Sequence, residues 1–141
     1  MYDNDVNGLL NKHLKRIPSY KFIPLIPQLA PHMSNVPDTF TNKIESILER
    51  CAMEHPHHTL PILLALKNLY NDSKYCGKKV TKAEPRVLGA QQLIQRLSST
   101  AIGPIIEEMD RLSDALVKLA YYDIDVKGRG SLILSYVIYC L

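Results

Sequence analysis

The chain has 141 residues, of which 46% are hydrophobic and 22% are charged. These proportions are typical of a globular domain and exclude global disorder and low-complexity classes. Its 17 Lys and Arg residues against 14 Asp and Glu residues give a formal net charge of +3, too mild for the dense basic stripe of a dedicated nucleic-acid-binding protein. Aromatic residues make up 7%, and leucine and isoleucine recur throughout, so the composition favours packed helices over a β-sandwich.

The cysteines and the N-terminus indicate a reducing compartment. Three cysteines, at positions 51, 76 and 140, form no C-x-x-C pair, which argues against a disulfide scaffold or a zinc ribbon. The first seven residues include Asp3 and Asp5 and lack an apolar run, so we expect no signal peptide. No apolar stretch reaches the roughly 18 residues of a membrane span. We therefore expect an intracellular protein with no membrane partner.

The N-terminal part predicts one regular helix and one interrupted helix. Residues 5–17 read as a helix with basic residues in its last turn, where cations complement the helix dipole. Ser19 is a suitable N-cap for a second segment. Pro27 and Pro31 should kink or end this segment, because an interior proline costs about 3 kcal/mol. Its apolar stripe is Phe22, Leu25, Ile26, Leu29 and Met33.

Two further helices should follow. Asp38 can cap a helix that stops at His55-Pro56. The apolar face of that helix is Phe40, Ile44, Ile47, Leu48 and Cys51. A fourth helix is predicted over 57–70, where leucines are dense enough to be buried on more than one side. Those leucines are Leu60, Leu63, Leu64 and Leu66.

The C-terminal half predicts a basic loop and two more helices. Residues 71–86 carry basic side chains and little apolar periodicity, so we expect an exposed loop. A helix over 85–99 should bury one face and be weakened slightly by Gly89. That face is Val87, Leu88, Leu93, Ile94 and Leu97.

Gly103-Pro104 opens the most regular helix of the sequence. Its outer face carries two acid-first i,i+4 pairs, worth a few tenths of a kcal/mol each: Glu107 with Arg111, and Asp114 with Lys118. The apolar residues repeat every three or four positions, at Ile105, Met109, Leu112, Leu116 and Leu119.

The elements together predict an all-α fold of antiparallel helical hairpins, with helix pairs recurring about every 40 residues as in solenoid repeats. We expect residues 1–125 to form this helical segment. Residues 126–141 should be an irregular apolar tail that the helical pattern does not include. The predicted inter-helix core is Phe22, Leu25, Leu29, Leu60, Leu63, Leu64, Met109, Leu112 and Leu116.

One polar cluster has metal-ligand character. Cys51, His55 and His58 stand at i, i+4 and i+7, and on an unbroken helix such side chains could ligate zinc. Pro56 argues against an unbroken helix, and no fourth ligand is spaced nearby. We favour the interpretation that the histidines shape a turn, cap the next helix or pack, and we expect no metal site.

Other candidate chemistries fail on residue type or spacing. The glycine-containing stretches 77–79 and 127–131 lack the pattern of a phosphate-binding loop. Asp123 and Asp125 lack the Asn or His that would accompany a catalytic carboxylate pair. Cys51 would need a histidine from elsewhere to act as a nucleophile. The basic stretches 12–16 and 71–86 lack interleaved aromatics that would stack bases. We therefore predict no catalytic, cofactor-binding or metal-binding residue and no direct nucleic-acid site.

Two longer stretches carry a family resemblance. NKHLKRIPSYKFIPL at 11–25 and MEHPHHTLPILLAL at 53–66, in this order and at this separation, closely resemble the last part of the FAT domain of ATM-type protein kinases. RVLGAQQLIQRL and the helix at 105–122 resemble the family's arrangement too. The resemblance covers roughly residues 9–125. Pro27 and Pro31 depart from it, because similar family members have helix formers there.

The resemblance implies a non-catalytic helical scaffold that packs against the kinase domain and the remaining helical repeats of a large, nuclear, homodimeric serine/threonine kinase. Such a kinase belongs to the phosphatidylinositol-3-kinase-related class, uses ATP and magnesium, and acts in DNA damage response and DNA repair. This chain carries none of the catalytic motifs, so no cofactor is expected in it. The alternative hypothesis is a stand-alone small helical adaptor that binds protein partners through its surface.

Overall fold

The computed structural model describes residues 13–14, 16–36, 38–76, 81 and 84–120. Within these ranges every regular element is a helix, and no strand occurs. The predicted all-α fold is confirmed, and the packing is compatible with a helical repeat segment. The elements are η1 (Ser19–Leu25), α2 (Ile26–Leu29), η2 (Ala30–His32), α3 (Thr39–Glu54), α4 (Pro56–Cys76), α5 (Pro85–Ser98) and α6 (Gly103–Ala120).

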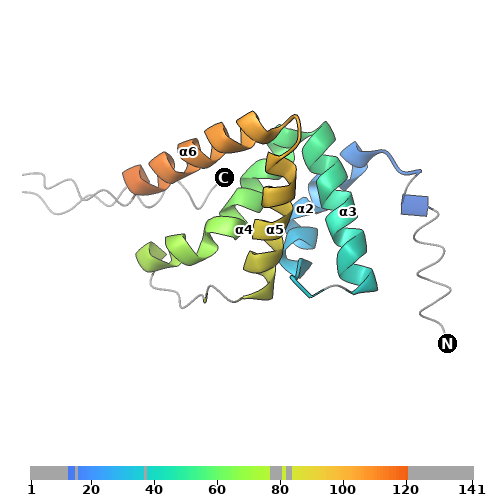
Figure 1. Cartoon of the computed structure of the whole chain (residues 1–141), viewed down its shortest axis with the longest axis horizontal. Coiled ribbons are helices and arrows are strands. Elements are labelled where there is room, and N and C mark those ends of the chain that lie inside the picture. The colour runs from blue at the N-terminus through green and yellow to red at the C-terminus, as the bar shows by residue number, and fades with distance from the viewer. Residues whose placement is uncertain (1–12, 15, 37, 77–80, 82–83, 121–141) are drawn as a thin grey trace, which may run out of the picture.

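Successive long helices reverse direction, and α6 crosses one end of the group (Figure 1). Helix α4 is central, because it packs against α3, α5, α6 and the segment before α3. Leu60, Leu63 and Leu64 of α4 are fully buried, as the density of leucines predicted. None of the helices in the described ranges has the length and apolarity that a bilayer crossing requires.

The prolines divide the second segment into short pieces, as predicted. Pro24 lies within the 3-10 helix η1, and Pro27 and Pro31 are the second residues of α2 and η2, respectively. A proline lacks the N–H that an interior helical position must donate, but the first positions of a helix need none. The stripe that faces the core is Phe22, Ile26, Ala30 and Met33. Leu25 is 43% exposed, so its predicted core position is wrong: η1 turns every three residues, not every 3.6.

Helix α3 begins and ends where the sequence predicts. The Asp38 carboxylate accepts hydrogen bonds from the backbone N–H groups of Phe40 and Thr41, both at 2.7 Å, and from the Thr41 hydroxyl at 3.0 Å. The two bonds from Thr41, through its backbone N–H and its hydroxyl, lower the pKa of Asp38; burial opposes this shift, and the bond from Phe40 adds to it. Phe40 itself is 57% exposed. It packs edge-on against His32 instead of entering the core, so this member of the predicted apolar face is also wrong.

The loop predicted at 71–86 begins later than expected. Helix α4 continues to Cys76, so 71–76 is helical, and α5 begins at Pro85 as predicted. Residues 77–80, 82–83 and 121–141 lie outside the described residues. The glycine-containing stretches 77–79 and 127–131, Asp123, Asp125 and the predicted apolar tail therefore fall outside them, as does the start of the predicted N-terminal helix. At the C-terminal end of the predicted N-terminal helix, Arg16 and Ile17 donate backbone hydrogen bonds to the His13 carbonyl in a terminal turn.

Two glycines allow close approaches that a Cβ atom would prevent. A Cβ on Gly89 of α5 would lie 2.8 Å from the backbone nitrogen of Ser34 and 3.2 Å from Cβ of Met33. A Cβ on Gly103 would lie 2.4 Å from the carbonyl oxygen of Ser98. Gly89 therefore lets α5 pack directly on the segment that follows η2, and Gly103 permits the tight turn between α5 and α6.

Candidate interaction surface on helix α6

The most regular apolar stripe of the sequence faces outward. Leu112 is 59% exposed, Leu116 is 49% exposed and Leu119 is 59% exposed, whereas Ile105 and Met109 are partly buried against the core. The predicted core positions of Leu112 and Leu116 are therefore wrong. Consecutive residues of an α-helix lie about 100° apart around its axis. The face of α6 that meets the core is therefore the one next to the leucine stripe. Ile106 and Ala120 are buried on that face.

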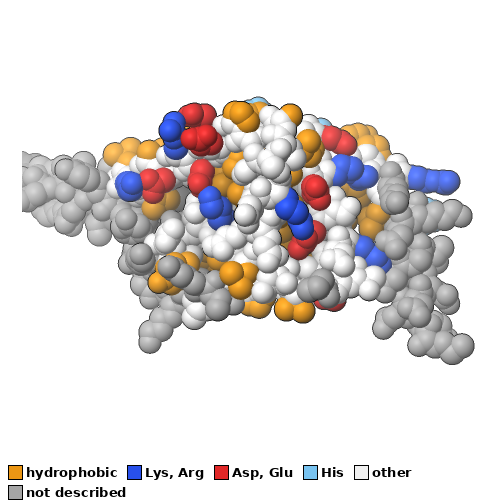
Figure 2. Space-filling model, in the orientation of Figure 1, with side chains coloured by type: hydrophobic (Ala, Val, Ile, Leu, Met, Phe, Trp, Pro, Cys, Tyr) orange, Lys and Arg blue, Asp and Glu red, His pale blue; other side chains and the backbone are white. Residues whose placement is uncertain are grey.

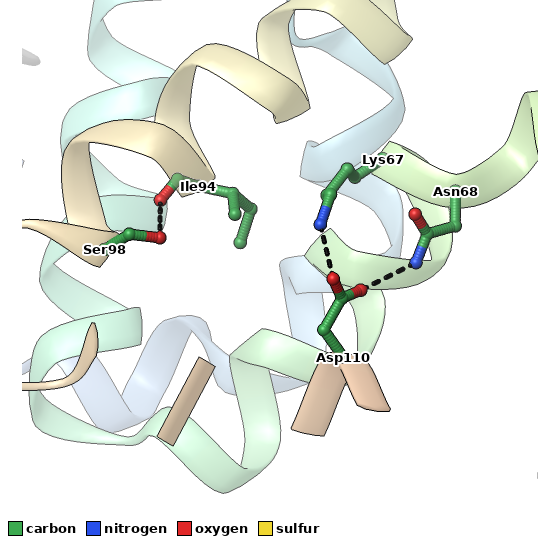
Figure 3. Close-up of polar contacts among 5 residues, drawn as sticks. All are labelled: Lys67, Asn68, Ile94, Ser98 and Asp110. Atoms are coloured by element: carbon green, nitrogen blue, oxygen red, sulfur yellow. Dashed lines mark hydrogen bonds and ion pairs between the residues drawn. The ribbon is translucent and has the colours of Figure 1, made fainter. Parts of the chain in front are cut away.

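A polar contact sets the rotation of α6 on α4. Lys67 Nζ lies 2.7 Å from Oδ2 of Asp110, and the Asn68 amide donates to Oδ1 of Asp110 at 2.9 Å. Figure 3 shows both α4 side chains pointing toward this carboxylate, which projects from α6. A half-buried carboxylate needs hydrogen-bond donors. Asp110 reaches the donors on α4 only when its side of α6 faces α4. The leucine stripe is then left outside.

The same contact perturbs the acid strength of Asp110. Burial on its own raises the pKa of this carboxyl, but the hydrogen bonds from Lys67 and Asn68, together with the positive charge of Lys67, outweigh burial. The net result is a pKa below the ordinary value. The carboxylate therefore stays charged, and its bond to α4 remains formed, under mildly acidic conditions.

We expect Asp110→Asn to destabilise the protein at pH 7 by about 1 kcal/mol, because it removes the ion pair with Lys67 but keeps an acceptor for Asn68. The folded-state pKa of Asp110 is depressed, so its stabilisation is full above the unfolded pKa of about 4 and is lost as the pH falls through the folded value. The stability difference between wild type and variant should shrink below about pH 4. Urea denaturation between neutral and acidic pH measures it. Asp114→Asn, which changes an exposed ion pair, should be almost as stable as wild type at every pH. A stability difference between Asp110→Asn and wild type that is the same at all pH values would contradict the stabilising role assigned to the Asp110 carboxylate.

An open groove of about 540 Å³ lies between α4 and α6. Its apolar lining comes from Leu64 and Ala65 of α4 and from Leu116 and Val117 of α6, and Asp110 adds a polar edge. Because Leu116 belongs to both the groove and the exposed stripe, the two features form one continuous surface. We call this surface the α6 face and define it by the groove together with Leu112, Leu116 and Leu119.

The charged side chains beside the α6 face form ion pairs with one another. Arg111 lies 3.6 Å from Glu107 and 3.2 Å from Glu108, and Lys118 lies 2.6 Å from Asp114. Both predicted i,i+4 pairs are confirmed. Figure 2 shows red and blue side chains next to one another over α6, with hydrophobic side chains beside them. The surface is thus apolar, and the three carboxylates and two cations beside it are joined in ion pairs.

The histidine cluster has a structural arrangement. Helix α3 ends at Glu54 and α4 starts at Pro56, so Cys51 and His58 lie on different helices. The Ser19 hydroxyl hydrogen-bonds the Glu54 carboxylate and lies 3.0 Å from Nε2 of His55. A hydroxyl has one hydrogen to donate, so Ser19 donates to Glu54 and accepts from His55. These bonds join the start of η1 to the end of α3, in agreement with the turn-shaping interpretation.

Cys51 lacks the surroundings of a nucleophile. Its side chain is fully buried, and its sulfur donates to the backbone carbonyl of Ser19 at 3.5 Å. Burial raises the pKa of this thiol, with Arg50 opposing and Glu54 adding to the shift. A neutral thiol is a poor nucleophile and a poor metal ligand. Across the ranges that the structure describes, no group of three or more His, Cys, Asp and Glu side chains could hold a metal ion.

Sequence reasoning missed the long-range contacts of Arg50. Its guanidinium donates to the backbone carbonyls of Leu14, at 3.2 Å, and Ile17, at 2.8 Å, and lies 5.6 Å from the centre of the Phe22 ring. It thereby holds the last turn of the N-terminal segment against α3. The backbone acceptors of such a contact leave no pattern in the sequence. The Asp110 contact did leave one signal, an acidic residue beside an apolar stripe.

Comparison with known proteins identifies several that are similar to this sequence. No protein-family model matches the chain. It is 32% identical, over 83% of its length, to "Serine/threonine-protein kinase ATM" of Arabidopsis thaliana, and 31% identical, over 85%, to "Serine-protein kinase ATM" of Sus scrofa. It is 35% identical, over 72%, to "Serine/threonine-protein kinase tel1" of Aspergillus oryzae. The chain spans only 3% or 4% of the length of these curated relatives. By sequence, this chain is an ATM-like kinase fragment, homologous to one short stretch of the ATM and Tel1 kinases.

Proposed function

We propose that this segment is a non-catalytic helical scaffold within an ATM-like serine/threonine kinase, corresponding to the last part of the FAT domain, and that it packs against the kinase domain. The observation that carries the proposal is the α6 face. Monomeric soluble proteins rarely expose a continuous apolar surface that has no partner. A segment homologous to 3% or 4% of a much longer chain has such a partner in the rest of that chain.

The proposal includes a wider role, which the similarity to ATM and Tel1 kinases supports. The parent kinase binds ATP and magnesium outside this segment, acts as a homodimer with the kinase domain and the remaining helical repeats as neighbours, and works in the nucleus in DNA damage response and repair. The segment contributes architecture: α4 and its neighbours form a rigid core, and α6 presents the surface that meets the next domain.

A domain exchange tests this function. Residues 13–120 would replace the homologous stretch of the Aspergillus oryzae Tel1 kinase, and phosphorylation of a protein substrate would be measured with ATP and magnesium. We expect the exchanged kinase to retain activity and a kinase lacking the stretch to lose it. The isolated 141-residue chain should phosphorylate nothing. Full activity of the deletion, or a folded but inactive exchanged kinase, would contradict the scaffold proposal.

We expect Leu112→Gln combined with Leu119→Gln to change the stability of the isolated chain by less than about 0.5 kcal/mol per substitution, because both side chains are exposed. The same double variant should aggregate less than wild type, since it removes apolar surface. Thermal denaturation and light scattering measure the two effects. Val36→Gln, at another exposed apolar position, is the matched control. A large drop in stability would mean that the stripe belongs to the core after all.

A further inference from the structure

The spacing of the exposed stripe defines the shape of its partner. The apolar stripe of α6 repeats at intervals of four, three, four and three residues from Ile105 to Leu119. Ile105 and Met109 pack partly against the core, and the exposed part of the stripe is Leu112, Leu116 and Leu119. These three leucines have the spacing of a coiled-coil seam, in which side chains at positions a and d insert between the side chains of a facing helix. The seam is separate from the core-facing side of α6, where Asp110 bonds to α4. Helix α6 therefore has two packing sides, and within the described part of the chain the leucines on one of them are 49% to 59% exposed.

The pattern distinguishes a helix from other partners. An extended strand presents side chains with a period of two and cannot match the four-three repeat over more than one turn. An anionic membrane surface would be attracted by unpaired cations along the seam. The cations beside this seam, Arg111 and Lys118, each lie within 4 Å of a carboxylate on the same helix. A facing helix with its own apolar seam satisfies the spacing and needs no unpaired cation on α6.

We propose that the seam of α6 binds a single α-helix supplied by another part of the same kinase polypeptide, in a coiled-coil arrangement. This inference rests on the proposed scaffold function and specifies its contact. The homologous stretch is 3% or 4% of the relatives' length, so the remainder of such a chain is tethered to this segment. Tethering raises the effective concentration of a partner helix well above that of a second molecule.

The isolated chain tests the recognition step. The probe is a fluorescent three-heptad peptide with leucine at every a and d position and Glu, Lys and Ala elsewhere. The comparison peptide has the same composition with its leucines distributed evenly around the helix. We expect the chain to bind the patterned peptide at least about tenfold more tightly than the comparison peptide, measured by fluorescence anisotropy. Leu112→Gln combined with Leu116→Gln should remove this preference, and Val36→Gln should preserve it.

Two outcomes of that experiment overturn the proposal. Equal affinity for the two peptides, or no binding to either, would show that the seam does not select a helix. Sedimentation of the chain alone tests whether a second copy of the chain occupies the seam instead. A dimer that Leu112→Gln combined with Leu116→Gln abolishes would assign the seam to a second copy of the chain.

Photo-cross-linking in the exchanged Tel1 kinase tests the source of the helix. A benzophenone amino acid replaces Leu112, Leu116 or Leu119, one position per variant, and the adducts are mapped by mass spectrometry. We expect the three positions to react with one segment of the same polypeptide, at sites three or four residues apart. Scattered adducts, or adducts to a second molecule, overturn the inference. An active exchanged kinase with scattered adducts refutes this contact alone, whereas a folded but inactive exchanged kinase refutes the scaffold function.

Discussion

Replacing Leu63 with alanine should lower the free energy of unfolding by about 2 to 5 kcal/mol, the range for truncating a large aliphatic side chain in a packed core. Leu63 is 0% exposed and lies in the core cluster that α4 shares with the neighbouring helices. The loss combines the transfer of the removed methyl groups with the cavity that rigid neighbours leave behind. Chemical denaturation followed by circular dichroism measures the effect.

The matched control for this substitution is Leu119→Ala. It removes the same atoms from a helix of the same molecule, but the side chain is 59% exposed, so the expected change is within about 0.5 kcal/mol. Similar losses for the two variants would mean that α6 packs differently from the arrangement described above. An unchanged denaturation midpoint for Leu63→Ala would contradict the central position of α4.

Replacing Gly89 with alanine should destabilise the protein by about 1 to 3 kcal/mol, the usual cost of overpacking. The direction of this stability change is informative. In an unobstructed helix interior the same change stabilises by up to about 1 kcal/mol, because alanine has the higher helix propensity. Here the new methyl group would lie 2.8 Å from the backbone nitrogen of Ser34, and backbone atoms cannot move aside without displacing the segment after η2. Thermal unfolding measures the change.

Gln92→Ala provides the control for Gly89. Gln92 is exposed on α5, so its replacement tests helix propensity without the contact to Ser34. We expect this variant to be as stable as wild type or slightly more stable. A gain in stability from Gly89→Ala would refute the close approach of α5 to the segment after η2, and would restore the view from sequence that this glycine only weakens its helix.

Local signals in the sequence predicted the element boundaries well, because the interactions that end a helix lie within a few residues. Asp38 caps α3 through hydrogen bonds to residues two and three positions later. The His55-Pro56 pair separates α3 from α4, and Gly103 opens α6. Among the boundaries within the described residues, the end of α4 at Cys76 lies furthest from its predicted position. The polar composition after Tyr70 is equally compatible with an exposed helix and with a loop.

The orientation of α6 could not be predicted in the same way. Periodicity shows that a helix has an apolar stripe, but it does not show whether that stripe meets this chain's core or another surface. The decision depends on Asp110, whose donors Lys67 and Asn68 lie more than forty residues away in sequence. The family resemblance, by contrast, was available from two short stretches, and the comparisons confirm it at the level of ATM and Tel1 kinases.

The position of α6 at one end of the helix group has a consequence for local opening. Helix α4 contacts helices on several sides, whereas α6 contacts mainly α4 and α5. Elements with fewer buried contacts open at a lower free energy than the global transition. The amide hydrogens of α6 should therefore exchange with solvent faster than those of α4 around Leu63. In a longer kinase chain, a helix bound to α6 would slow this exchange and couple the rigidity of the segment to the presence of its neighbour.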